Sequence, residues 1–348
     1  MRPNQEWCCK HPTGEDIYLF ALHNSKGARA VLSNYGAIIN SFVIPMPGGQ
    51  SNDIVLGFDT VEHYWSPAYL AQYPWFGSAV GRYANRVKEG KFSIDKKQYQ
   101  LSRNKGRDHL HGGHEGFDKK IWQLVSLTDT RLELQLISPD GDEGYPGTLK
   151  VNIRFDLNEQ NELSYEYHAI TDQPTPLNLT HHSYFNLDNG EGEITGHLVR
   201  IPASHILEQD ANLVATGNLL PVEHTASDFR RFKKISENWD PASGYDQSYV
   251  IDPQEKSPAL VAEAYSPVSK TLLKVYSSEP VLHFYTGKWI PETRGKRGNA
   301  YGAYSGFCLE TQVHPNAINI PHFPNTILKP GESYYHKTIY SVITGWEK

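Results

Sequence analysis

Strict alternation of apolar and polar residues is the feature of this sequence that most restricts its fold. In residues 132–136, 151–157 and 163–167 every second residue is apolar and those between are polar, and residues 158–161 (Asn-Glu-Gln-Asn) resemble a turn. A period of two is that of a β-strand with one buried face. These stretches therefore predict antiparallel hairpins that cover a hydrophobic core.

The rest of the chain indicates the same fold class. We predict further hairpins at residues 91–101, 122–137 and 260–285, each interrupted by a turn-like segment. No internal repeat, low-complexity linker or shift in composition divides the sequence. We therefore expect an all-β protein, a large antiparallel β-sandwich with a few short helices, formed by residues 1–348 as one domain.

Helical patterns are few and short. One is Thr60–Gln72, which Pro67 would interrupt, and the other is Ser227–Trp239, where apolar residues recur every three positions. We expect both segments to cap a sheet.

Charge and composition exclude several classes of partner. The 348 residues carry a formal net charge of -6 and form no basic stripe, so we expect binding neither to nucleic acid nor to an anionic membrane. No stretch approaches the ~20 apolar residues of a membrane span. Three cysteines, two of them adjacent, show no disulfide pattern, and a cytoplasmic protein is expected. Aromatic residues make up 12% of the chain and suit a site where sugar rings stack on flat side chains.

One carboxylate and one histidine pair stand out as candidates for acid–base chemistry. Glu310 lies in the apolar, strand-like run 306–312, where a charge is costly unless it has a purpose. In residues 178–187 alternation places His182 on one face and His181 on the other, so only one histidine can line a pocket. A carboxylate and an imidazole can supply a general base and a general acid.

The histidine-rich segment 108–118 allows two interpretations. His109 and His111 would share a strand face and, with Glu115, resemble the metal-binding set of a cupin. Alternatively, Gly112 and Gly113 let the backbone approach a ligand while His111 donates a hydrogen bond to it. No phosphate-binding glycine loop, nucleophile elbow or Cys-x-x-Cys pair is present in the sequence.

Six motifs in order resemble the aldose 1-epimerase, or galactose mutarotase, family. They are Gly81–Arg86, Leu110–Gly113, Gly141–Gly147, Thr180–Leu187, Tyr245–Asp246 and Leu309–Gln312. The resemblance extends over nearly the whole chain. It implies a single-domain β-supersandwich that acts on free aldoses and needs no cofactor and no metal.

The resemblance also assigns roles to individual residues. It implies that Glu310 is the general base, that His182 is the general acid, and that Arg82, His111 and Asp246 hold sugar hydroxyls. One position departs from the family pattern: His283 precedes Phe-Tyr-Thr-Gly, where many relatives have glutamine. We expect His283 to contact the sugar and to affect its specificity rather than the proton transfers.

The chemistry needs no more than these groups. Anomers interconvert when the base takes the proton of the anomeric hydroxyl, the acid protonates the ring oxygen, and the opened aldose turns about C1–C2 and closes again. A carboxylate near His182 is expected to keep its imidazole protonated near pH 7. Trp75 and Tyr184 are candidates to cover a sugar face. A small-molecule aldose is the expected partner, and the protein is expected to be a monomer.

Four alternatives remain open from the sequence. A cupin-like, metal-dependent sugar isomerase would use the His109, His111 and Glu115 set. A glycosidase would pair Glu310 with Asp246. A hexose-6-phosphate mutarotase would need basic residues at the pocket rim, and the candidates are Lys288, Arg294, Lys296 and Arg297. A non-catalytic sugar-binding module would explain the aromatic residues but not a buried Glu–His pair.

Overall fold

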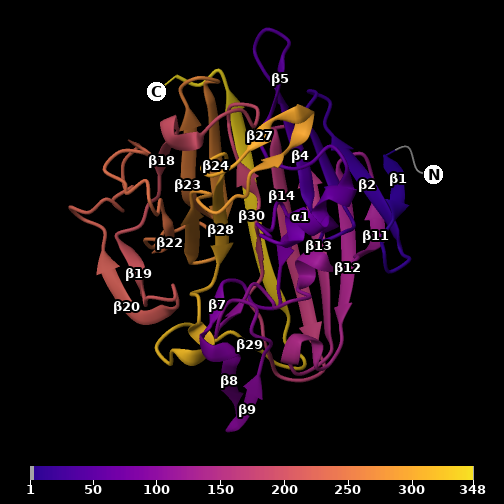
Figure 1. Cartoon of the computed structure of the whole chain (residues 1–348), viewed down its shortest axis with the longest axis vertical. Helices are drawn as coiled ribbons and strands as arrows, with labels where there is room; N and C mark the ends of the chain where they lie inside the picture. Colours follow the sequence, from indigo (N-terminus) through magenta and orange to yellow (C-terminus); the bar gives the residue numbers. More distant parts are fainter. Residues whose placement is uncertain (1–3, 348) are drawn as a thin grey trace.

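Two large antiparallel sheets and one smaller sheet form the body of the protein (Figure 1). The computed structural model describes residues 4–347, so that residues 1–3 and 348 of the predicted domain lie outside the described part. The longest helix in residues 4–347 has five residues, which confirms the all-β prediction. One hydrophobic cluster contains residues from β2 to β30 and supports the single domain, which stays a prediction.

The nine-stranded sheet is the largest layer. Its strands, in spatial order, are β11 (Gln123–Leu127), β12 (Arg131–Ser138), β13 (Leu149–Leu157), β14 (Glu162–Thr171), β30 (Tyr334–Thr344), β24 (Thr271–Ser277), β23 (Ala259–Ser266), β18 (Leu198–Arg200) and β21 (Lys233–Lys234). The alternation seen in the sequence places Val151, Ile153 and Phe155 fully inside the core, while the residues between them are partly exposed. The predicted hairpins in this part of the chain are confirmed.

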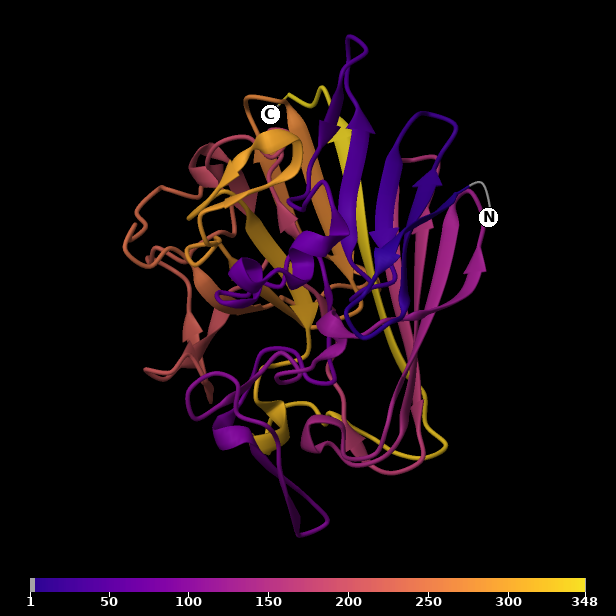
Figure 2. The same cartoon turned by 45° about the vertical axis from the view of Figure 1, so that its right-hand side comes forward.

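Two further sheets pack on the inner face of this layer. The five-stranded sheet contains β1 (Gln5–Lys10), β2 (Asp16–His23), β3 (Arg29–Ser33), β4 (Ile39–Pro45) and β5 (Ser51–Asp53). The six-stranded sheet runs in the order β17 (Tyr184–Phe185), β28 (Phe307–Gln312), β25 (Val281–Tyr285), β22 (Asp246–Val250), β19 (His205–Gln209) and β20 (Ala215–Pro221). Figure 2 shows β1–β5 in indigo in front of the magenta strands. Every residue of β28 is buried, because the nine-stranded sheet covers one face of this strand and the pocket residues cover the other.

Short ladders and turns complete the fold. The two-stranded pairs are β7 (Arg86–Val87) with β10 (His109–Leu110), β6 (Ala79–Val80) with β16 (Thr180–His181), β15 (Thr175–Pro176) with β29 (Ile327–Leu328), β26 (Thr293–Arg294) with β27 (Ala300–Tyr301), and β8 (Lys91–Ile94) with β9 (Lys97–Gln100). The 3₁₀ turns are η1 (Val61–Trp65), η2 (Lys88–Gly90), η3 (Phe117–Lys119), η4 (Asp142–Gly144), η5 (Ile194–Gly196), η6 (Lys296–Gly298) and η7 (Ala317–Asn319). The hairpin β8–β9, predicted at residues 91–101, projects from the body at the bottom of Figure 1.

The two helix predictions have different outcomes. Thr60–Gln72 contains η1 and the only α-helix in residues 4–347, α1 (Pro67–Leu70), with a break at Ser66. Pro67 occupies the first helical position of α1, where its missing N–H costs nothing.

The helix predicted at Ser227–Trp239 is wrong. This segment contains the edge strand β21 and runs along β18, so that the N–H of Ile235 donates to the carbonyl of His197 and the carbonyl of Phe229 accepts from Ile201. Pairing with the sheet edge therefore replaces the hydrogen bonds that a helix would make. The three-residue spacing instead serves packing, since Phe229 and Ile235 are both fully buried.

The predicted hairpin at 260–285 also divides between two sheets. β23 and β24 form the expected hairpin in the nine-stranded sheet, but β25 crosses into the six-stranded sheet and lies between β22 and β28. This crossing places His283 in the layer that carries Glu310. No helix among residues 4–347 is long and apolar enough to cross a membrane.

Candidate active site

A small cavity of about 110 Å³ opens on the face of the six-stranded sheet that carries His283 and Glu310. Five of the six residues predicted from the sequence line it, and these are His111, His182, Asp246, His283 and Glu310. Trp75 and Tyr184, the expected aromatic cover, also line it. The structure therefore brings together side chains that are up to 235 positions apart in the chain (Trp75 to Glu310).

Strand register explains how the acidic and imidazole groups meet. In the pairing of β22, β25 and β28, Ser248 lies opposite His283, and His283 lies opposite Glu310. Asp246 and Cys308 are each two residues away in their strands and so share this face. Phe284 and Leu309 point to the opposite face and into the core.

Glu310 is the most deeply buried ionisable group of the cavity. Only 1% of this residue is exposed, and its Oε2 atom has no hydrogen-bond partner in residues 4–347. Burial raises the pKa of its carboxyl to about 7, although the positive charges of His283 and Arg86 oppose the rise. A carboxyl with this pKa is suited to exchange a proton near neutral pH.

His182 faces Glu310 across the cavity. Its Nε2 atom lies 3.6 Å from Oε1 of Glu310, and its ring stacks between Trp75 and Tyr184. Burial lowers the pKa of His182 to about 3. The expectation that the carboxylate keeps this imidazole protonated near pH 7 is therefore wrong for this arrangement, because desolvation outweighs the attraction. At a pH between about 3 and about 7 the pair of Glu310 and His182 holds one proton, and the carboxyl of Glu310 carries it.

The facing of the histidine pair agrees with the alternation in the sequence. The ring of His181 points into the core, where Nε2 lies 3.2 Å from the carbonyl oxygen of Ala37 and Nδ1 lies 3.0 Å from Oγ of Ser183. His181 therefore packs, and His182 lines the cavity.

His111 is held as a hydrogen-bond donor to the cavity. The backbone N–H of Asn85 donates to its Nδ1 atom over 3.2 Å, which leaves the ring proton of the neutral imidazole on Nε2. Burial lowers the pKa of His111 well below its usual value, so the ring is neutral. Gly112 makes this position possible, since a Cβ at Gly112 would overlap the carbonyl oxygen of Gly81. The glycine thus permits a close approach to the chain itself rather than to a ligand.

The predicted metal set of His109, His111 and Glu115 is not assembled. Nδ1 of His109 lies 2.8 Å from the carbonyl oxygen of Ser102 and its Nε2 lies 2.7 Å from the hydroxyl of Tyr145, while Glu115 is exposed. Among residues 4–347, His111, His182 and Glu310 do bring possible ligand atoms within 4.8 Å of one another. Ligation by Nε2 of His111 would require its proton to move to Nδ1, where it would face the N–H of Asn85. The hydrogen bonding of His111 thus disfavours a metal ion.

His283 and Asp246 form a tight pair at one side of the cavity. Nε2 of His283 lies 2.9 Å from Oδ1 of Asp246, and Nδ1 lies 2.8 Å from Oγ of Ser248. Burial alone would raise the pKa of Asp246, but the hydrogen bond and the charge of His283 outweigh it and lower this pKa. Asp246 is therefore ionised and presents its second oxygen as an acceptor.

Arg82 does not reach the cavity, which corrects the prediction for this residue. Its guanidinium has five N–H donors, and its nitrogens make five hydrogen bonds, to Ser138 (Oγ and carbonyl), Pro139, Pro146 and Thr175. No donor is left for a sugar.

Arg86, four positions later in the same motif, lines the cavity instead and is 8% exposed. The sequence contained both arginines in one motif, but only the tertiary structure distinguishes them. Eight other lining residues were given no site role from the sequence: Gln72, Tyr73, Pro74, Asn85, Lys105, Leu110, Tyr285 and Trp289. Lys105 and Trp289 carried no signal there.

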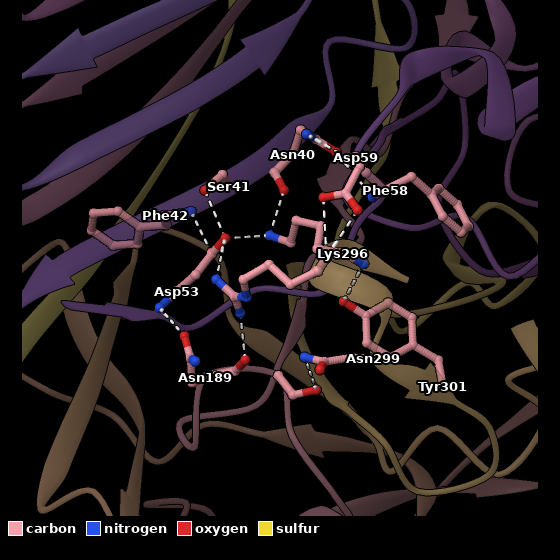
Figure 3. Close-up of polar contacts among 12 residues, drawn as sticks. Asn40, Ser41, Phe42, Asp53, Phe58, Asp59, Asn189, Lys296, Asn299 and Tyr301 are labelled. Atoms are coloured by element: carbon pink, nitrogen blue, oxygen red, sulfur yellow. Dashed lines mark hydrogen bonds and ion pairs between the residues drawn. The ribbon is translucent and has the colours of Figure 1, made fainter. Parts of the chain in front are cut away.

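The four basic residues considered for a phosphate site do not line the cavity either. Figure 3 shows where one of them lies: the ammonium of Lys296 is buried between the carboxylate of Asp53, at 2.6 Å, and the carbonyl oxygen of Asn40, at 2.8 Å. The backbone N–H of Arg297 donates to Asp59, and its guanidinium donates to the carbonyl of Asn189. These contacts attach the loop that follows β25 to the five-stranded sheet.

Comparison with known proteins agrees with the fold. The family model described as aldose 1-epimerase matches residues 18–341. Galactose mutarotase from Sus scrofa is 40% identical over 320 residues, covering 90% of this chain and 91% of that protein, and aldose 1-epimerase from Escherichia coli (strain K12) is 33% identical over 340 residues, covering 95% and 97%. A crystal structure of an aldose epimerase homologue from C. elegans superposes with a TM-score of 0.87 at 32% identity, covering 94% of this chain and 98% of that one. Galactose 1-epimerase from Lactobacillus acidophilus NCFM gives a TM-score of 0.84 at 27% identity and covers 98% of each chain.

Proposed function

Because the chain belongs to the aldose 1-epimerase family, we propose that it interconverts the α- and β-anomers of free aldohexoses such as galactose and glucose. The single observation that carries this proposal is the buried pair in which Nε2 of His182 lies 3.6 Å from Oε1 of Glu310. The two groups provide a carboxyl and an imidazole on the walls of one small cavity. The reaction is an isomerisation without a redox change.

One proton on the pair is sufficient for both half-reactions. Ring opening begins with Glu310 ionised and His182 protonated: Glu310 takes the proton of the anomeric hydroxyl while His182 gives its proton to the ring oxygen. After opening, the proton is on Glu310 and His182 is neutral. Closure on the other face reverses both transfers, so the pair returns to its starting form with the opposite anomer.

The two forms of the pair differ only in which partner holds the proton. Burial raises the pKa of Glu310 and lowers that of His182, which favours the proton on Glu310, the form that follows ring opening. A hydroxyl that donates to the carboxylate favours the ionised form of Glu310, and a sugar would supply such a donor at the unpartnered Oε2 atom. Each proton transfer of this kind contributes roughly 10²–10⁴ to the rate.

The remaining polar groups are suited to hold the other hydroxyls. His111 and Arg86 are donors, and Asp246 is an acceptor. Trp75 and Tyr184 provide flat surfaces beside the ring of His182. A sugar held at C2 to C6 leaves C1 able to turn, as anomerisation requires.

Polarimetry tests the proposal directly. Freshly dissolved α-galactose, α-glucose, α-xylose and glucose 6-phosphate are followed with and without the protein. We expect faster decay of the optical rotation of the neutral aldoses to the same equilibrium value. Decay at the spontaneous rate for every sugar would overturn the proposal and favour a sugar-binding module.

The same experiment separates the alternative activities. Activity should be unchanged by EDTA, and an aryl glycoside should release no product. Glucose 6-phosphate should be a poorer substrate than glucose, since Lys288, Arg294, Lys296 and Arg297 do not line the cavity and Lys105 is the single lysine among its lining residues. Loss of activity on chelation, restored by a divalent ion, would favour metal-dependent chemistry instead.

We further propose that the protein works as a monomer in the cytoplasm. Its three cysteines are free thiols, which suits a reducing compartment. Sedimentation equilibrium tests the monomer, and imaging of the tagged protein in its host cell tests the location.

A further inference from the structure

His283 lies at the centre of a row of polar side chains that crosses three strands. Ser248 on β22 and Glu310 on β28 are its direct cross-strand partners. Side chains opposite each other in an antiparallel sheet have Cβ atoms only about 4.5–5.5 Å apart. His283 is therefore a fixed neighbour of the proposed base, whatever sugar is bound.

Both ring nitrogens of His283 already have partners in the protein. Nε2 lies 2.9 Å from Asp246, and Nδ1 lies 2.8 Å from the hydroxyl of Ser248 and 3.5 Å from the amide nitrogen of Asn85. A glutamine amide would keep donors to spare at this position, but an imidazole has only two polar atoms. No ring nitrogen is left to bond a sugar hydroxyl, so the expectation that His283 is a direct contact is not supported by this geometry.

The two nearer partners, Asp246 and Ser248, suit a protonated ring. Asp246 accepts from Nε2–H in either state, and the hydroxyl of Ser248 can donate to a bare Nδ1 or accept from Nδ1–H. Burial alone would lower the pKa of His283, but the hydrogen bond and charge of Asp246 outweigh burial and raise it above its usual value.

The other charged and titratable groups around His283 come from several elements. Asp246 on β22 and Glu310 on β28 favour its positive charge, while Arg86 on β7 opposes it. The two neutral histidines of the cavity, His111 and His182, are disfavoured as cations by the same charge. A positive charge on His283 thus lowers the pKa of each of these groups: it favours the ionised carboxylates of Asp246 and Glu310 and the neutral imidazoles of His111 and His182.

We propose that His283 is a positioning residue that does not bind the sugar: it fixes Asp246 through Nε2 and places a positive charge beside Glu310, which favours the ionised base. The inference rests on the proposed function for its consequence in catalysis. The protonation of His283 itself can be tested without any activity.

The first test measures the ring directly. The protein is labelled with ¹³C at the Cε1 atoms of histidine, and the resonance that is lost in His283→Gln identifies His283. We expect this resonance to titrate with a pKa above 6.5 and the Ser248→Ala variant to lower that value. A ring that stays neutral down to about pH 5 would overturn the proposal.

The second test measures the effect on the base. The pH dependence of kcat/KM for galactose and glucose is compared in wild type, His283→Gln and a control, His205→Gln, at an exposed histidine on β19 of the same sheet. Removing a positive charge near Glu310 should raise the pKa of this base. The alkaline limb of the kcat/KM profile should therefore move to a pH higher by about 1 unit or more, and the plateau value of kcat/KM should fall. The control should leave the profile unchanged.

The outcomes separate the two proposals. A wild type that does not accelerate mutarotation overturns the proposed function, while the ring titration still decides whether His283 is charged. An active wild type whose alkaline limb is the same in His283→Gln overturns the role of His283. A changed ratio of kcat/KM for the two sugars with an unchanged pH profile would make His283 a sugar contact after all.

Discussion

The Sγ atom of Cys308 lies 3.4 Å from Nδ1 of His182, so a thiol faces the ring nitrogen that points away from Glu310. Burial raises the pKa of this thiol well above its usual value, and the group is therefore neutral. A neutral sulfur orients the imidazole without stabilising its cation, whereas a carboxylate in the same place would stabilise the cation. This contact helps to explain why His182 can remain a strong acid toward the ring oxygen of a sugar.

The contact predicts a graded effect of substitutions at position 308. Cys308→Ala should lower kcat by about 3- to 10-fold, the effect of one modest hydrogen bond, with little change in KM. Cys308→Ser should retain most of the activity, because a hydroxyl can orient the same nitrogen. Polarimetric kinetics of both variants, with circular dichroism to verify folding, decide this. Equal losses in both variants would mean that the volume of the sulfur matters more than its hydrogen bond.

Glu310→Gln should lower kcat by roughly 10²-fold or more, because it removes the base and keeps the shape. The affinity for the sugar should change little. His182→Asn should have a comparable effect on kcat. His181→Asn should act mainly on the free energy of unfolding, since the ring of His181 bonds to Ser183 and Ala37 in the core. Similar losses of kcat in the two histidine variants would contradict the assigned facing.

The two arginines of one motif should respond differently to substitution by methionine. Arg86→Met should raise KM with little loss of stability, because this side chain lines the cavity. Arg82→Met should reduce the free energy of unfolding by about 3 kcal/mol or more, because five hydrogen bonds, four of them buried, are lost. Urea denaturation and sugar kinetics on both variants are the measurements. A rise in KM without loss of stability in Arg82→Met would make Arg82 a sugar contact.

The buried ion pair of Lys296 and Asp53 should matter for stability and not for proton transfer. Burial lowers the pKa of Lys296, and the neighbouring carboxylate of Asp53 opposes this effect. Lys296→Met leaves the buried carboxylate of Asp53 with the more distant guanidinium of Arg297, at 3.9 Å, and should cost about 3–5 kcal/mol of unfolding free energy. Lys296→Met combined with Asp53→Leu should cost less than the sum of the two single changes. Lys288→Met is the control and should change stability little.

Glu279 should make the fold less stable at alkaline pH. Burial raises the pKa of this carboxyl from 4.5 to about 8. A proton held more tightly in the folded chain stabilises the fold fully below the unfolded pKa, and this contribution is lost as the pH rises through about 8. Glu279→Gln should therefore be more stable than wild type by about 2 kcal/mol or more near pH 9, with a smaller difference near pH 5. A difference that does not vary with pH in chemical denaturation would show that Glu279 is not protonated in the native state.

Local sequence patterns predicted those features that depend on one strand and its two faces. The alternation in residues 151–157 predicted a buried face because a strand turns successive side chains to opposite sides. The same rule distinguished His182 from His181, since adjacent residues of a strand face opposite ways. Glu310 stood out because a carboxylate in an apolar strand is costly without a function.

Features that depend on how strands meet were decided by the tertiary structure. The three-residue spacing in Ser227–Trp239 indicated a helix, but the edge of β18 offered the backbone other hydrogen-bond partners. The motif alone does not distinguish Arg82 from Arg86. In the structure, the carbonyl groups of the distant residues 138, 139 and 146 accept hydrogen bonds from Arg82 and keep its guanidinium away from the cavity. The sequence showed that His283 departs from the family pattern, but it did not show that Ser248 and Glu310 are its cross-strand neighbours.

The sequence by itself therefore determined the fold class, because periodicity is a local property of the chain, and its motifs indicated the family and the acid–base pair proposed here. The tertiary structure decided which side chains reach the cavity and in which direction the pKa of Glu310 and that of His182 shift. Register places His283 opposite Glu310, and burial lowers the pKa of His182 to about 3. Both effects arise from residues that are distant in the sequence, since desolvation and cross-strand contact exist only after the sheets have packed.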